Sequence, residues 1–135
     1  MNRFQPRLNI AQPDGWFAKE SLTVISPDGQ ANVIASSEPL DEDIDAQQYA
    51  EVQGDLLHRE FNEYHQISFG PGDAFGRRGF IRVFEWRPSD GVRVTQIQIY
   101  YAEKGRGYTA TATTPSTQFA RFELQFWSVL DEIRV

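Results

Sequence analysis

The feature that most constrains this fold is a run of three strand-like segments between positions 79 and 113, with only turn residues separating them. Residues 80–87 and 92–101 are rich in Val, Ile, Phe and Tyr, and a Pro-Ser-Asp-Gly turn lies between them. Residues 108–113 alternate strictly between Thr and either Tyr or Ala. β-branched and aromatic residues favour strands, and strict alternation is typical of a strand with two different faces. The pattern therefore predicts a three-stranded antiparallel meander.

Pairing around the Pro-Ser-Asp-Gly turn predicts which side chains of the meander share a face. If Ile81 and Val83 lie beside the two isoleucines of residues 97–99, these four side chains form the core side of the sheet. The opposite side is then too apolar for a freely solvated sheet surface. Its candidate partner-binding residues are Phe80, Arg82, Phe84, Trp86, Val94, Gln96, Gln98 and Tyr100. Two alternatives stay open, because either another protein or a helix of the same chain can cover this side.

The residues before the meander predict a short strand, a hairpin and an acidic loop. Leu8 and Ile10 indicate the strand, and the Pro-Asp-Gly-Trp turn after it would bring the indole of Trp16 into the core. Short apolar runs flank a second Pro-Asp-Gly turn at 27–29, which is typical of a hairpin. The segment 38–45 carries five acidic residues and no basic one. We expect it to be a solvated loop that leads into a helix.

The first helix is predicted to begin after Asp45 and to end near Phe61. Asp45 is a preferred N-cap residue, and Gln48 stands at the third helical position, as in a capping box. The apolar stripe of this helix consists of Tyr49, Val52 and Leu56. Gly54 costs about 1 kcal/mol relative to Ala in a helix interior. Its presence is explained if a neighbouring element approaches the helix closely there.

The rest of the chain predicts one brief strand and a final helix. Residues 67–69 can pair briefly before a glycine-rich stretch, 70–79. Gly70-Pro71-Gly72 is expected to interrupt the pairing, and Arg77 and Arg78 are expected in a loop. Ser116 or Thr117 can cap the final helix. The apolar stripe of that helix is Phe119, Phe122, Phe126, Leu130 and Ile133. We therefore expect one α+β domain over residues 1–135, with a twisted antiparallel sheet of about five to seven strands, one central helix and a C-terminal helix packed on the sheet.

This order of elements resembles the PsbP-like superfamily, and most of all its bacterial DcrB-like branch. The residues that carry the resemblance are Pro13-Asp14-Gly15-Trp16, Trp86 followed by Gly91, Gln96, Thr109-Ala110-Thr111-Ala112, and the helix from Phe122 to Leu130. They are structural residues, and their order and spacing extend over nearly the whole chain.

The resemblance implies a binding module, because the superfamily has no common catalytic site. Its members include extrinsic subunits of photosystem II, a nuclear-import factor that binds a small GTPase, envelope lipoproteins, and dimeric cytoplasmic chaperones that hold apolar helices of type VI secretion effectors. For this chain it implies a non-catalytic adaptor or chaperone-like homodimer that holds an apolar segment of a partner protein, such as a secreted effector. The alternative within this class is a docking subunit of a larger complex.

Composition and charge narrow the classes of partner. The net charge of −6 disfavours binding to nucleic acid, and the absence of cysteine excludes thiolate chemistry. No apolar run of about 18 residues occurs, so we expect no membrane insertion. If Met1 is the native start, no secretory leader is present and the protein is expected in the cytoplasm. No cofactor motif is found.

The only two histidines, His58 and His65, supply the competing class of function. Together with carboxylates of the 38–45 loop they would serve a small hydrolase or lyase. Their seven-residue separation is not the i, i+4 spacing of a helical metal pair, so we expect two exposed histidines and no metal. The alternating aspartates of the loop resemble a calcium site, but Ala46 and Val52 stand where such a loop needs Gly and Glu.

Overall fold

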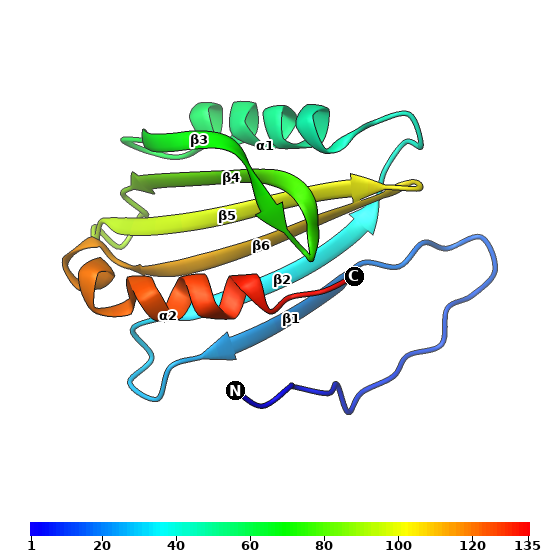
Figure 1. The fold of residues 1–135 in the computed structure, drawn as a ribbon, viewed down its shortest axis with the longest axis horizontal. Coiled ribbons are helices and arrows are strands. Elements are labelled where there is room, and N and C mark those ends of the chain that lie inside the picture. The colour runs from blue at the N-terminus through cyan, green and yellow to red at the C-terminus, as the bar shows by residue number, and fades with distance from the viewer.

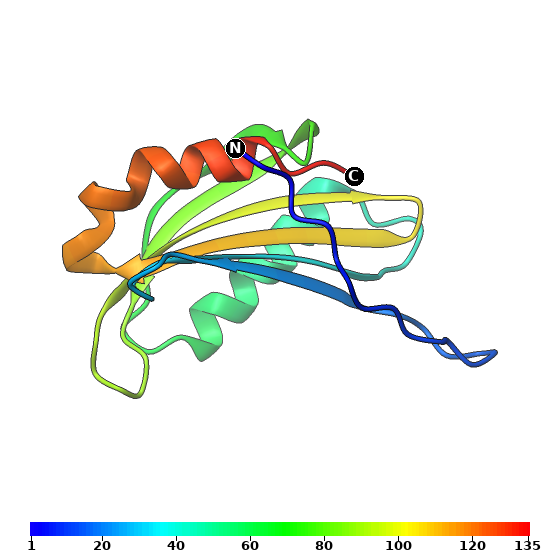
Figure 2. The ribbon, with the colours of Figure 1, turned by 90° about the horizontal axis from the view of Figure 1, so that it is seen from below.

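The computed structural model describes residues 1–135 as a six-stranded antiparallel sheet with one helix on each side (Figures 1 and 2). The elements are β1 (Glu20–Ile25), β2 (Asn32–Pro39), α1 (Ala46–Glu60), β3 (His65–Ala74), β4 (Arg77–Trp86), β5 (Val94–Glu103), β6 (Arg106–Pro115), a 3₁₀ turn (Ser116–Gln118) and α2 (Phe119–Asp131). The strand order is β1-β2-β6-β5-β4-β3. The predicted α+β class, strand number and pair of helices are confirmed.

The predicted meander forms the centre of the sheet as β4, β5 and β6. Ile81 pairs with Ile99 and Val83 with Ile97, so the expected register is confirmed. The strand expected to start at position 92 begins at Val94, and the turn before it is closed by Gly91 at a positive φ of 83°. Glycine adopts this left-handed conformation without the steric cost that a Cβ would add.

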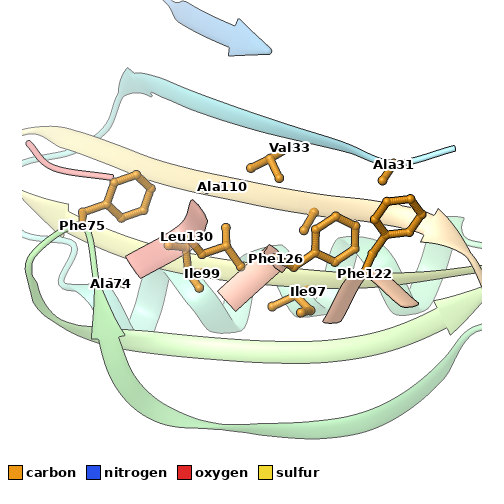
Figure 3. Packing of buried hydrophobic residues seen from close by; sticks show 11 residues of the cluster. Ala31, Val33, Ala74, Phe75, Ile97, Ile99, Ala110, Phe122, Phe126 and Leu130 are labelled. Carbon is orange, nitrogen blue, oxygen red and sulfur yellow. The ribbon is translucent and has the colours of Figure 1, made fainter. Parts of the chain in front are cut away.

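The main hydrophobic core lies between α2 and the sheet (Figure 3). Phe122, Phe126 and Leu130 are buried there, as the stripe predicts, and they contact Ile97 and Ile99 of β5 within one cluster. The alanines of β6 leave room for these rings. The expected Ser or Thr cap is wrong, because a 3₁₀ turn precedes α2 and its N-cap residue, Gln118, makes no side-chain capping bond.

Helix α1 begins as predicted and covers the other side of β4 and β5 (Figure 2). The Asp45 carboxylate accepts a bond from the Gln48 backbone N–H, while the Gln48 side chain accepts one from the Asp45 N–H, which forms the expected capping box. The stripe expected to face the core is only partly right. Tyr49 is buried, but Val52 is 52% exposed, and Ala50 and Leu57 face the sheet instead.

Strand β3 is much longer than the expected pairing at 67–69. It has ten residues, with a break in register between Gln66 and Ser68, and it includes Pro71, which was expected to interrupt pairing. Proline is tolerated because β3 is an edge strand, where a backbone N–H can point away from the sheet. Arg77 and Arg78 accordingly lie in β4 and not in a loop.

Residues 1–19, called here the N-terminal arm, lie outside every helix and strand, so the strand expected around Leu8 and Ile10 is absent. The side chain of Trp16 is 70% exposed and does not enter the core. The Pro13–Trp16 turn does form, with the Trp16 N–H bonded to the Pro13 carbonyl at 3.1 Å. Local turn chemistry was therefore predicted correctly, whereas the strand lacks a neighbour to pair with in a single copy of the chain.

Candidate partner-binding face

The sheet side opposite α2 carries all eight predicted partner-binding residues, but α1 covers some of them. Arg82, Phe84 and Tyr100 are buried, which removes them from any surface that a partner could reach without moving α1. The other five residues are half-buried: Phe80, Trp86, Val94, Gln96 and Gln98. Of the two alternatives, coverage by a helix therefore holds over β4 and part of β5, and an accessible surface remains beside α1, on the rest of β5 and on the strands next to it.

Arg82 is the centre of the covered part. It is 3% exposed, and its guanidinium donates to the Gln66 Oε1 at 3.1 Å, the Ala50 carbonyl at 3.2 Å and the Tyr100 hydroxyl at 2.7 Å. Its Cζ lies 4.2 Å from the centroid of the Phe69 ring. A buried charge without a carboxylate partner is costly, so the three neutral acceptors and the aromatic face are what hold the guanidinium there.

Gly54 allows α1 to approach this arginine. A Cβ built on Gly54 would lie 2.8 Å from Arg82 Cζ and closer still to its Nη2. The expectation that this glycine permits a close approach is confirmed, and the approaching group is a side chain of the sheet.

Tyr49 of α1 packs edge-on against Tyr100 of β5, and the hydroxyl groups of both tyrosines stay protonated. Burial raises the pKa of Tyr49 to about 12, and the neighbouring Glu38 carboxylate adds to the effect, although the bond to Thr109 opposes it. Burial also raises the pKa of Tyr100, with the Arg82 charge acting in the opposite direction. Tyr49 Oη lies 2.9 Å from the Thr109 hydroxyl, so this side of α1 reaches β6.

Beyond Tyr49 the sheet surface is uncovered, and we call this surface the open face. It comprises the α1-side residues Ile25, Ile34, Gln96, Gln98, Thr111 and Thr113. Gln96 donates to the Thr113 hydroxyl at 2.7 Å and Gln98 to the Thr111 hydroxyl at 3.2 Å. Because these polar groups bond to one another across β5 and β6, the open face can meet an apolar surface without leaving them unpaired.

Helix α1 forms a wall along one side of the open face. Val52 and Leu56 follow Tyr49 at helical spacing, so the three lie on one side of α1, the side that reaches β6. Val52 is 52% exposed, and Ile34 on β2 is 38% exposed. The stripe read from the sequence therefore marks an apolar border of the open face and is only partly core.

Sequence reasoning missed Ile25, Ile34, Thr111 and Thr113 as members of this surface. The signal for the threonines was present, since strict alternation in β6 placed them on the face opposite the buried alanines. The position of the isoleucines needed the pairing of β2 with β6, which joins residues about 75 positions apart and leaves no local pattern.

The two histidines lie apart from the open face. Both are exposed, and the His58 ring packs edge-on against Tyr64 with centroids 5.6 Å apart. A hollow of about 220 Å³ is lined by His58 together with Glu51, Gly54, Asp55, Tyr64, Gln66 and Arg82. No group of three or more His, Asp or Glu side chains is arranged to hold a metal ion. The two carboxylates that line this hollow with His58 belong to Glu51 and Asp55 of α1, and none belongs to the 38–45 loop.

None of the helices is long and apolar enough to cross a membrane. Neither a protein-family model nor a curated protein matches the sequence. Solved structures do match the fold. PA94 of Pseudomonas aeruginosa, a protein of unknown function regarded as a candidate regulator, superposes with a TM-score of 0.72 at 14% identity, over 92% of this chain and 88% of PA94.

Two further structures extend the comparison. The cyanobacterial PsbP of Synechocystis gives a TM-score of 0.54 at 10% identity, over 90% of this chain and 95% of that protein. The fold is PsbP-like. LpqN of Mycobacterium tuberculosis, which is involved in cell envelope biogenesis, gives a TM-score of 0.55 at 16% identity, over 79% of this chain and 63% of LpqN. At these identities the PsbP-like fold is what the chain shares with them.

Proposed function

We propose that this protein is a non-catalytic, cytoplasmic adaptor or chaperone-like homodimer that holds an apolar segment of a partner protein against the open face. The proposal places it in the DcrB-like branch, whose members include chaperones of type VI secretion effectors. The PsbP-like fold is compatible with this role but does not distinguish it from that of a docking subunit in a larger complex.

The observation that carries the proposal is the combination of the open face with its α1 wall. Gln96, Gln98, Thr111 and Thr113 form the floor of the open face. They present methyl and methylene groups, while their amide and hydroxyl groups already bond to one another. Exposed Val52 and Ile34 lie on either side of that floor, on α1 and β2. An apolar segment lying between them would bury these side chains at about 25 cal/mol per Å² of apolar surface removed from water.

The test uses a defined probe, a labelled 18-residue Leu/Ala-rich peptide, and fluorescence anisotropy. The double variant Ile34→Asp/Val52→Asp places one negative charge on each side of the floor, and we expect it to weaken peptide binding at least tenfold. Leu124→Asp/Val135→Asp is the matched control, because both residues are exposed and apolar, lie on or just after α2 on the other side of the sheet and add the same charge. Equal binding by the two variants would contradict the proposal.

The second candidate is a small hydrolase or lyase, which the hollow beside His58 favours. His58 shares this hollow with two carboxylates, Glu51 and Asp55. The histidine ring packs against Tyr64, however, and does not bond to either carboxylate, so the arrangement lacks an oriented base. Turnover of a panel of ester and amide substrates that is lost in His58→Ala would establish this candidate in place of the first.

A further inference from the structure

The N-terminal arm exposes more apolar surface than a single copy of the chain can cover. All of its residues are exposed, including Leu8 at 93% and Ile10 at 94%. Its other large exposed apolar residues are Met1, Phe4, Trp16 and Phe17. Scattered apolar residues are ordinary on a surface, but six large ones within 17 consecutive residues are the mark of an interface.

The strand that follows the arm is also incomplete. β1 is at the edge of the sheet and pairs with β2 on one side only, so its outer backbone groups have no strand beside them (Figure 1). Its side chains Leu22, Val24 and Ile25 are exposed as well. An unpaired edge strand with apolar side chains is a template for another strand.

The arm is held away from its own β1. The Arg106 guanidinium donates to the Ala18 carbonyl at 2.7 Å, and the turn from Pro13 to Trp16 redirects the chain beyond it. In Figure 1 the arm leaves the start of β1 and loops outward before its beginning returns near the sheet. Near the beginning of the arm, Arg3 Nη2 lies 3.6 Å from Glu132 Oε2. Leu8 and Ile10, in the middle of the arm, contact neither β1 nor the core.

We propose that two copies of the chain exchange their arms, and that residues 7–12 of each add a strand to the free edge of β1 in the other. Leu8 and Ile10 alternate with polar or small residues, as a strand with one apolar face requires. They would cover Leu22 and Val24 of the second copy. Pro6 and Pro13 bound the segment, which suits an added outer strand because proline cannot continue a ladder.

The area is of the size that a stable dimer needs. Each arm carries three exposed aromatic residues, Phe4, Trp16 and Phe17. At about 150–250 Å² for a fully buried aromatic side chain, the aromatics of two arms alone supply on the order of 1,000 Å². Stable interfaces bury about 1,200–2,000 Å² in total. Burial of Leu8 and Ile10 in the two added strands would raise the total area into this range. Reciprocal exchange gives a closed two-fold dimer with no free arm left.

This inference rests on the proposed homodimer and assigns its contact surface. The first test measures mass in solution by light scattering and sedimentation. Wild type is expected to be a dimer, and Leu8→Asp/Ile10→Asp a folded monomer with unchanged far-UV circular dichroism. Asn9→Asp/Gln12→Asp is the matched control, because it adds the same charge to polar positions of the same arm, and it is expected to stay dimeric.

The second test detects the exchange itself. The chain has no cysteine, so Ile10→Cys and Val24→Cys each introduce a single reactive thiol. A short bismaleimide should link the two variants when they are mixed and refolded together, and should link neither variant alone.

A monomeric wild type would overturn both the homodimer and the exchange. A dimer that survives Leu8→Asp/Ile10→Asp, or that gives no mixed cross-link, would overturn the exchange alone. Peptide binding at the open face is measured separately, so its failure would not be confused with either result.

Discussion

Substitution of Gly54 by Ala is the sharpest test of how α1 packs on the sheet, because local and tertiary effects have opposite signs. In an isolated helix the change would stabilise by about 1 kcal/mol. In this protein the added Cβ would meet the Arg82 guanidinium, with Cζ at 2.8 Å. The arginine is buried between Phe69 and α1 and cannot move away without breaking its bonds to the Ala50 carbonyl and the Tyr100 hydroxyl.

Overpacking of a well-packed site costs about 1–3 kcal/mol, and each bond from a charged donor contributes about 1.5–3 kcal/mol. Overpacking together with the loss of one such bond costs about 2.5–6 kcal/mol, so after the gain of about 1 kcal/mol in helix propensity is subtracted we expect Gly54→Ala to lower the free energy of unfolding by about 1.5–5 kcal/mol. Urea unfolding followed by circular dichroism should show the midpoint lowered by at least about 1 M, given slopes of about 1–3 kcal/mol/M.

A double-mutant cycle with Arg82→Met identifies the cause. In the Arg82→Met background the clash is relieved, so Gly54→Ala should become neutral or stabilising by up to about 1 kcal/mol. A stabilising Gly54→Ala in the wild-type background would refute the close packing of α1 on Arg82.

Two further predictions follow from the core and the tyrosines. Phe126→Ala should lower the free energy of unfolding by about 3–5 kcal/mol, because this ring is buried between α2 and the sheet. Trp127→Ala should lower it clearly less, because Trp127 is half-buried at the border of the core. Equal losses of unfolding free energy for the two variants in urea would contradict the assigned face of α2. The folded-state pKa of Tyr49 is raised from 10.0 to about 12, so its contribution to stability is complete below pH 10 and is lost as the pH rises toward 12. Tyr49→Phe should therefore flatten the fall in stability over that window, and an unchanged pH profile would argue against burial of this hydroxyl.

Local signals in the sequence predicted the elements that depend on short-range chemistry. The Asp45–Gln48 capping box, the hairpin turn at Pro27–Gly29 and the register of β4 with β5 all follow from residues close together in the chain. The stripe of α2 was equally clear because three phenylalanines recur at helical spacing. These features were predicted because the interactions that form them are local or strictly periodic.

The features that were wrong depend on contacts between distant residues. Val52 was assigned to the core because periodicity marks an apolar stripe but not the angle at which a helix rests on a sheet. Pro71 was taken as a strand breaker because nothing nearby shows that β3 would be an edge strand. Burial of Arg82 was equally invisible, although Gly54 in the middle of a helix was a sign that some group had to come close.

The side of the sheet that carries the candidate residues was predicted, but the part of that side that stays uncovered was not. The sequence indicated an unusually apolar sheet side with Gln96 and Gln98, and the open face contains both. Phe84 and Tyr100 were assigned to it as anchors, but they form the small core under α1 and its surroundings. Which part of a sheet face a helix covers is decided by tertiary packing, so the sequence left that alternative open.

The most direct test of the open face as a binding surface is methyl NMR of the Ile, Leu and Val side chains during titration with the Leu/Ala-rich peptide. We expect the largest shift changes at Ile34, Val52 and Leu56, with Leu124 and Val135 unchanged because they lie on or just after α2, on the other side of the sheet. Shift changes centred on α2, or none at any of the three border residues while the peptide binds, would contradict the account.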